Sequence, residues 1–258
     1  MTDYHDLMDA AIDELKARGV PVPEEIKRRD KREPKRREKM DVEDRLLGAF
    51  HKHFKRQLAA VLSHVENRTG RKDWGIEIEP DDDMAGRVVR YLITAAMGGV
   101  DLFGEQIRIG INYSLTNDKA ATWARNYAYD LIKDINATTQ KLVSSAVNDF
   151  VQTPGMTVAD LRQRLAPTFG DLRASKIAVT ETTRAYAQGW RMAGDDLKAD
   201  YPDLRIIKTW FTNADDVVCD VCGPLHGVTV DFDEDFAGVD EPPAHPNCRC
   251  WTIAGVQS

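Results

Sequence analysis

The four cysteines of this 258-residue chain constrain its fold most strongly, because they lie in two close pairs near the C-terminus. Cys219 and Cys222 form a CxxC, and Cys248 and Cys250 follow after a loop of 25 residues. A CxxC turn directs two sulfur atoms toward one point, and a second pair completes a tetrahedral metal site. If the chain is extended at Arg249, the two cysteines beside it share one face. The spacing therefore predicts a metal-binding knuckle between Cys219 and Cys250.

His245 is a fifth candidate ligand, because it lies three residues before Cys248 in a loop that Pro243 and Pro246 make nearly rigid. We expect the four cysteines to bind the metal, with His245 as a substitute ligand or as a group that supports a ligand. A site of three cysteines and His245 is the open alternative. His226 is a weaker candidate.

The metal is expected to be zinc in a closed, structural site. Two disulfides also fit the count, but the chain begins MTDYHDLMD without the apolar core of a secretion signal. A redox CxxC leaves the second pair unexplained. A catalytic zinc keeps one position open, and the chain has neither the HxE and PCxxC pattern of nucleobase deaminases nor HExxH. We therefore expect no enzymatic activity.

The composition is typical of a soluble globular protein, with 42% hydrophobic and 30% charged residues. No apolar run approaches the roughly 20 residues of a membrane helix, so no membrane partner is expected. The formal net charge of -7 argues against a nucleic-acid binder as a whole, although local patches can still act.

One such patch, the basic arm, runs from Lys27 to Lys39 with nine basic residues against three acidic ones. A run of this kind repels itself and builds no core, so it predicts a mobile arm or an exposed helix end. Either it contacts phosphates or an acidic protein surface, or it is an ordinary solvated linker. The candidate contacts with DNA or a partner protein are Lys27, Arg28, Arg29, Lys31, Arg32, Lys35, Arg36, Arg37 and Lys39.

Helical periodicity dominates the first 200 residues. The first long helix is expected to start at a cap on Asp41, and its histidines His51, His53 and His64 are expected at a surface or interface rather than in a metal pair. Further helices are expected from Leu7 to Leu15, from Asp81–Asp83 to Gly98–Gly99, which should loosen or end the helix, and from Asn117 to Gln152. A short helix is expected after Thr157, with Asp160 completing a capping box. A last helix is expected after Gly170, with Leu172 among its core contacts.

The period changes after Tyr201–Pro202, where three strand candidates follow at 205–211, 227–232 and 248–256. The predicted fold is mainly α, a bundle of long helices followed by a small α+β C-terminal module with a metal-stapled knuckle. The expected domains are 1–40 with the N-terminal helix and basic arm, 41–170 as a helical domain, and 171–258 with the knuckle.

The knuckle is acidic. Between Lys208 and Arg249 there is no lysine or arginine against nine carboxylates. A zinc module that binds a phosphate backbone is positively charged. The acidic knuckle is therefore expected to avoid nucleic acid and to suit a basic protein surface.

The segments ASKIAVTETTRAYAQGW, KTWFTNADDVVCDVCGPLHG and PPAHPNCRC, in this order, resemble the C-terminal domain of the phage head morphogenesis family, the Mu F-like minor head proteins of tailed phages. The resemblance covers Asp171 to Val256 and makes 171–258 the Mu F-like domain. Val179 departs from it, since members often carry arginine there. The matching positions are Thr180, Glu181, Trp210, Asp215, Gly227, Pro243, His245, Pro246, Cys248 and Cys250.

The resemblance implies a virion protein in few copies, associated with the portal and other head proteins, that acts in head morphogenesis and in genome packaging or delivery. It implies a location in the head interior or at the portal vertex, and in the host cytoplasm during assembly, with no small-molecule substrate. The basic arm then becomes a candidate contact with packaged DNA or portal. The alternatives are a DNA-binding zinc-knuckle protein and a toxin- or transferase-like enzyme using Glu181 and Arg184, which at this spacing more simply form a helix ion pair.

Overall fold

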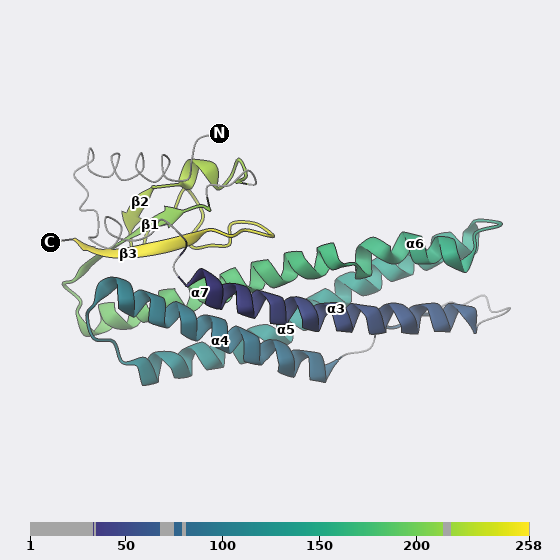
Figure 1. The fold of residues 1–258 in the computed structure, drawn as a ribbon, viewed down its shortest axis with the longest axis horizontal. Coiled ribbons are helices and arrows are strands. Elements are labelled where there is room, and N and C mark those ends of the chain that lie inside the picture. The colour runs from purple at the N-terminus through teal and green to yellow at the C-terminus, as the bar shows by residue number, and fades with distance from the viewer. Residues whose placement is uncertain (1–32, 34, 68–74, 79–80, 214–217, 258) are drawn as a thin grey trace. The chain divides into compact units, whose positions relative to one another are not determined.

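The computed structural model describes residues 33, 35–67, 75–78, 81–213 and 218–257 (Figure 1). The predicted helix at Leu7 to Leu15 lies outside these residues. The described helices and strands are α3 (Arg36–Glu66), α4 (Asp82–Ile107), α5 (Tyr113–Gln152), α6 (Val158–Phe169), α7 (Asp171–Asp200), β1 (Arg205–Phe211), the 3-10 helix η1 (Gly223–Leu225), β2 (Thr229–Asp231) and β3 (Trp251–Gln257). The predicted fold class, mainly α with a small C-terminal strand module, is confirmed.

The chain divides into two compact units. The knuckle unit falls within Met1–Val42, Leu92–Ala124 and Val179–Ser258, and the helical unit within Glu43–Tyr91 and Arg125–Ala178. The expected domains, 1–40, 41–170 and 171–258, stay a prediction.

The helical unit has an apolar interior to which α3, α5, α6 and α7 contribute. The ring of Phe54 meets Phe169 edge-on at 6.3 Å, and the Arg173 guanidinium lies 4.8 Å from the Phe54 centroid. Arg173 also donates hydrogen bonds to the Thr139 hydroxyl and the Thr168 carbonyl. Through these contacts Arg173 links α7 to α3, α5 and α6, and its guanidinium has hydrogen-bond acceptors in its buried position.

Three helix starts are set by side chains that accept hydrogen bonds from backbone N–H groups. The α4 start is confirmed, because the Met84 N–H donates to Asp81 Oδ1 over 2.9 Å. Asn112 caps α5 by accepting from the Leu115 N–H, so α5 begins before the predicted cap at Asn117. The Thr157 and Asp160 capping box of α6 is confirmed.

The predicted start of the first long helix at Asp41 is wrong, since α3 begins at Arg36. Lys39 is 5% exposed and forms a 2.7 Å ion pair with Glu33. Lys35 lies 3.2 Å from Glu105. Carboxylates neutralise this part of the basic arm, so it continues as helix.

Gly98–Gly99 does not end its helix, since α4 continues to Ile107. A Cβ on Gly99 would lie 2.0 Å from the Tyr186 carbonyl oxygen. A Cβ on Gly189 of α7 would lie 1.8 Å from the Ala96 carbonyl oxygen. Because glycine has no side chain, the two helix backbones can approach this closely at Gly99 and Gly189. The sequence pattern did not reveal this contact.

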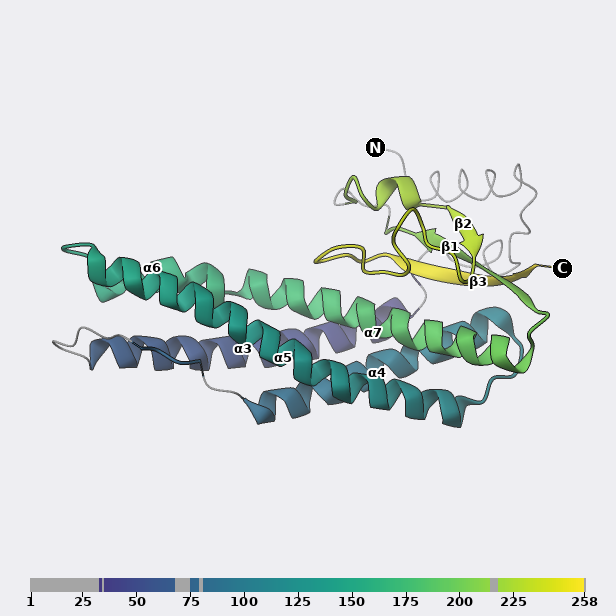
Figure 2. The same cartoon turned by 180° about the vertical axis from the view of Figure 1, so that it is seen from behind.

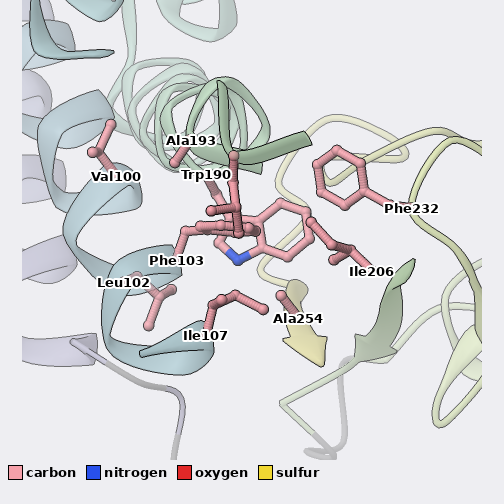
Figure 3. Close-up of a cluster of buried hydrophobic side chains, with 10 residues drawn as sticks. Val100, Leu102, Phe103, Ile107, Trp190, Ala193, Ile206, Phe232 and Ala254 are labelled. Atoms are coloured by element: carbon pink, nitrogen blue, oxygen red, sulfur yellow. The ribbon is translucent and has the colours of Figure 1, made fainter. Parts of the chain in front are cut away.

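A cluster of buried apolar side chains joins α4, α7 and the sheet (Figure 3). Phe103 meets Trp190 edge-on at 5.3 Å, and Phe232 lies 5.5 Å from Trp190. Gln106 Oε1 accepts from the Trp190 indole and from the Ala254 N–H. This cluster fixes the sheet against the two helices within the knuckle unit.

Two side chains differ from the expectation. Leu172 is 71% exposed, because it lies two residues from Ala174 and so on the far side of the helix from the buried alanines. His53, expected at a surface or interface, is 2% exposed because it lies on the inward face of α3 that includes Phe50 and Phe54.

The three strands form an antiparallel sheet in the order β2-β1-β3. Figure 1 shows β1 between the other two, and Figure 2 shows the short connection from α7 into β1. Phe211 at the end of β1 is paired with Trp251 at the start of β3. This register places the chain that leaves β1 beside the chain that enters β3, where the two cysteine pairs lie.

Candidate metal centre

The donor atoms of the knuckle converge as the spacing predicted. His245 Nε2 lies 3.0 Å from Cys219 Sγ and 3.2 Å from Cys222 Sγ. Cys222 Sγ lies 3.7 Å from Cys248 Sγ. Cys219, Cys222 and His245 form one close triad, and Cys222, Cys248 and Cys250 form another. Cys222 is the member that the two triads share.

A cavity of about 30 Å³ lies between these atoms. This space is about that of one small ion or water molecule. Its other lining residues come from the end of β1 and from the two cysteine loops. The lining residues are Thr212, Asn213, Val218, Cys219, Cys222, His245, Asn247, Cys248, Arg249 and Cys250.

The donors fit zinc. All four cysteines are free thiols, and a Cys222–Cys248 separation of 3.7 Å is far beyond a disulfide bond of about 2.05 Å. It is close to the edge of a tetrahedron whose zinc–sulfur bonds are about 2.3 Å, which is about 3.8 Å. The sulfur positions therefore disagree with two disulfides and agree with a thiolate metal centre.

His245 presents the correct nitrogen. Its Nδ1 lies 2.8 Å from the Pro246 carbonyl oxygen, which only accepts, so Nδ1 carries the proton. The Nε2 lone pair is thus directed at the sulfurs of Cys219 and Cys222. A carbonyl that fixes the tautomer in this way is typical of metal-binding histidines. The geometry keeps His245 among the candidate ligands beside the four cysteines.

The thiols differ in their affinity for protons. A hydrogen bond from Cys250, with backbone hydrogen bonds from Cys250 and Ala244, lowers the pKa of Cys248 to about 5 against the effect of burial. Burial and the neighbouring Cys248 raise the pKa of Cys222 to about 12. In a close cluster of cysteines, one sulfur is a thiolate and its neighbour keeps its proton, because two adjacent negative charges repel. A bound cation removes this restriction by replacing the protons.

The weaker candidate His226 has another role. Its Nδ1 lies 3.1 Å from the Thr212 N–H, which donates to it, and its ring packs edge-on against Phe211 at 5.6 Å. Burial lowers the pKa of His226. Within the described residues, the groups of close metal donors do not include it.

Sequence reasoning missed a buried ionic cluster beside the knuckle. Lys208, in the middle of β1, is fully buried, and its Nζ donates to the Asp240 carboxylate and backbone carbonyl and to Glu241 Oε1. Arg191 also contacts both acids. Burial raises the pKa of Glu241 to about 7, with Lys208 and Arg191 opposing the rise. The available signal was a lysine inside the apolar strand RIIKTWF, which requires a buried anion.

The residues of the basic arm, and the pair Glu181 and Arg184, are the remaining candidate site residues. Lys27, Arg28, Arg29, Lys31 and Arg32 lie outside the described residues, and Arg36 and Arg37 are exposed on the first turn of α3. Lys35 and Lys39 are engaged by carboxylates. The predicted ion pair of Glu181 and Arg184 is present at 3.3 Å.

Residues 141–253 match the family model of Phage Mu protein F like protein. The searches of the curated proteins and of the solved structures found no match. The matched range includes all five donors of the knuckle and begins earlier than the resemblance at Asp171, because it takes in the end of α5 and all of α6. Over residues 141–253 the chain is therefore similar to the Mu F-like phage head morphogenesis family.

Proposed function

We propose that the chain is a portal-associated minor head protein of a tailed phage that acts in head morphogenesis and in genome packaging or delivery. The match of residues 141–253 to the Mu F-like family carries this proposal. The family is one of structural head proteins, which supports a virion location and a non-enzymatic role. None of the described helices is long and apolar enough to cross a membrane.

The metal of the knuckle is zinc and its role is structural. A sheet with strands of seven, three and seven residues buries little surface of its own. Within their described residues, the two cysteine loops contain no long helix or strand, so one ion bound by both would fix their ends together. Cys222 and three of Cys219, Cys248, Cys250 and His245 would hold it.

The two partner surfaces have opposite charge. The carboxylates of the knuckle suit a basic surface on the portal or another head protein, and the basic arm suits packaged DNA or an acidic portal surface. Within the described part of the arm, Arg36 and Arg37 are the exposed cations. Lys35 and Lys39 are left out of this contact, because their ammonium groups face carboxylates.

A stop codon in this reading frame of the encoding phage tests the role in assembly. We expect particles without a stable DNA-filled head in electron micrographs, and rescue by the wild-type chain supplied from a plasmid. Quantitative mass spectrometry of purified virions should find the chain at a few copies, comparable with portal. Normal yields of filled, infectious heads, or absence from virions, would contradict the proposal.

The partner of the basic arm is tested by Arg36→Glu with Arg37→Glu. Lys52→Glu with Lys55→Glu is the matched control, because it makes the same charge change at exposed positions of α3. We expect only the arm variant to lose low-salt DNA binding or portal co-purification. If truncation of residues 1–32 together with the arm variant leaves both unchanged, the arm is a solvated linker.

A further inference from the structure

The sheet has two faces, and α4 and α7 pack against one of them. Neighbouring residues of a strand point to opposite faces, and residues paired across two antiparallel strands share a face. Ile206 and Ala254 belong to the buried cluster around Trp190, so they lie on the face that meets the helices (Figure 3). The opposite face, called the far face below, includes Ile207, Thr209 and Phe211 of β1 and Trp251, Ile253 and Gly255 of β3.

The centre of the far face is buried. Ile207 is 5% exposed, Phe211 is 0% exposed and Trp251 is 7% exposed. The rings of Phe211 and Trp251 stack at 6.1 Å, and the hydroxyls of Thr209 and Thr229 are hydrogen-bonded over 2.8 Å. These contacts run along the sheet, whereas water is excluded from a sheet face only by a second layer packed on it. A covering layer therefore lies on the far face.

The described residues account for one end of this layer. The imidazole of His226 packs edge-on against Phe211 at 5.6 Å. Among the described residues, the cluster of Figure 3 and the cluster at the cysteines include neither Ile207 nor Trp251. The rest of the covering layer is therefore to be sought in the chain outside the described residues.

The N-terminal segment has the length and the pattern of such a layer. Residues 1–32 form the longest part of the chain outside the described residues, and each of the other parts has seven residues or fewer. Apolar residues recur in it at spacings of three and four, which places them on one side of a helix. They are Leu7, Met8, Ala11, Ile12 and Leu15. A helix with this pattern buries one side and leaves the other in water.

The dimensions of this helix and of the far face agree. A helix rises about 12 Å from Leu7 to Leu15, and a strand extends about 13 Å from Ile207 to Phe211. With its side chains a helix is about 10 Å wide, which covers two neighbouring strands about 4.8 Å apart. One short helix is therefore sufficient to cover the far-face residues of β1 and β3.

The described chain also begins beside the sheet. Glu33 is 9% exposed and lines one small cavity together with Trp251 and Thr252, so it lies at the start of β3. Leu15 lies 18 residues before Glu33. A fully extended chain of this length spans about 60 Å, whereas a strand of seven residues is about 23 Å long. The segment can therefore reach the far face of its own sheet.

We propose that residues 7–15 pack as an amphipathic helix on the far face, with their apolar side against Ile207, Phe211 and Trp251. The sheet then lies between this helix on one face and α4 and α7 on the other, as the middle layer of three. The basic arm from Lys27 to Lys39 is then held at both ends, by this helix and by α3, and forms a strap rather than a free tail. The packing depends neither on the metal nor on the proposed role in the phage head.

The test uses the full zinc-loaded chain with the photo-crosslinking residue p-benzoylphenylalanine in place of Ile253, which is half-buried on the far face. Irradiation should join this position to residues 7–15 of the same chain, as identified by mass spectrometry of the peptides. The matched control carries the same residue in place of Val256, which is 37% exposed on the other face of β3, and should not give this product.

Two variants of the segment test which side of the helix is buried. Ile12→Glu places a charge on the apolar side and should lower the yield of the crosslink about tenfold or more. Ala10→Glu makes the same neutral-to-glutamate change away from that side and should leave the yield unchanged. Equal yields in the two variants would contradict the proposed packing.

The crosslinked products identify any other occupant. A product that joins two chains would show that a second copy covers the far face, and a product with residues outside 7–15 would assign the position to another segment. Either result overturns the proposal, as does the absence of any product. Thermal melting identifies a chain that fails to fold. If the change at Ile253 has this effect, the photo-crosslinking residue at Met8 replaces it, and the lack of a product with β1 or β3 then overturns the proposal.

Discussion

The Asn247 N–H donates a hydrogen bond to the Thr180 hydroxyl over 2.7 Å, which joins the middle of α7 to the loop immediately before Cys248. Asn247 has a φ of 65°, in the left-handed region that most side chains avoid. A buried hydroxyl that accepts this N–H therefore supports the conformation that places a metal ligand.

Thr180→Val should destabilise the knuckle unit by about 1–3 kcal/mol, because it leaves a loop N–H without this acceptor. Zinc affinity should fall as well. Thr182→Val is the matched control, since the Thr182 hydroxyl is buried without a partner and its loss should be neutral or stabilising. Urea unfolding and a chromophoric zinc competition assay measure both effects. Equal effects of the two variants would show that the hydrogen bond has no special role.

Removal of the metal should unfold the knuckle. Protein purified without chelator should contain about one zinc per chain by mass spectrometry, and a strong chelator should lower the melting temperature. Cys222→Ser should abolish binding because Cys222 belongs to both donor triads. The exposed Val221→Ser in the same loop should keep its zinc. Zinc-free wild type with unchanged melting would exclude a structural metal.

The same assay resolves the ligand set. If the imidazole is a ligand in place of Cys250, His245→Ala should weaken zinc binding far more than Cys250→Ser, and the reverse holds for four thiolates. Cobalt substitution supplies an independent readout, since thiolate-to-cobalt charge-transfer absorption scales with the number of sulfurs. Equal zinc affinity in both variants and the wild type would exclude both ligand sets.

Gly99→Ala and Gly189→Ala should each destabilise the protein by about 1–3 kcal/mol or more, although alanine is the better helix former. The added methyl groups would collide with backbone carbonyl oxygens at 2.0 and 1.8 Å. Gly86→Ala in α4 meets nothing within 4 Å and should stabilise by up to about 1 kcal/mol. Stabilisation by all three changes in urea unfolding would show that the two helices do not approach this closely.

Glu241 should make stability depend on pH. Its pKa rises from 4.5 to about 7 in the folded protein, so between these values the native state binds a proton that the unfolded state releases. The contribution is fully present below pH 4.5 and is lost as the pH rises through 7, on the order of 3 kcal/mol in all.

The measurement is the difference in unfolding free energy between wild type and Glu241→Gln at pH 5 and pH 7.5. Zinc loss at low pH affects both proteins and cancels in this difference. The advantage of the wild type should shrink toward pH 7.5. A difference that is constant, or that grows with pH, would mean that Lys208 and Arg191 keep Glu241 ionised throughout.

Much of the fold could be predicted because its signals are local. The capping boundary of α6 depends on Thr157 and Asp160 three residues apart, and β1 on seven consecutive residues. The knuckle was predictable for the same reason, since all four cysteines lie in two short motifs. Errors arose where a residue far along the chain determines the structure, as when Glu105 pairs with Lys35 and the helix starts before Asp41.

The sequence by itself determined the helical class, the small sheet and the five candidate donors of the knuckle. These features depend on periodicity, turn residues and ligand spacing, which involve residues close together in the chain. Only the tertiary structure decided that Gly99 and Gly189 mark a close helix approach and that Lys208 is buried among acids. It also decided that His53 is buried, with its Nε2 unpartnered among the described residues. These properties depend on residues far apart in the chain, and burial changes the energy of a polar group only once those residues meet.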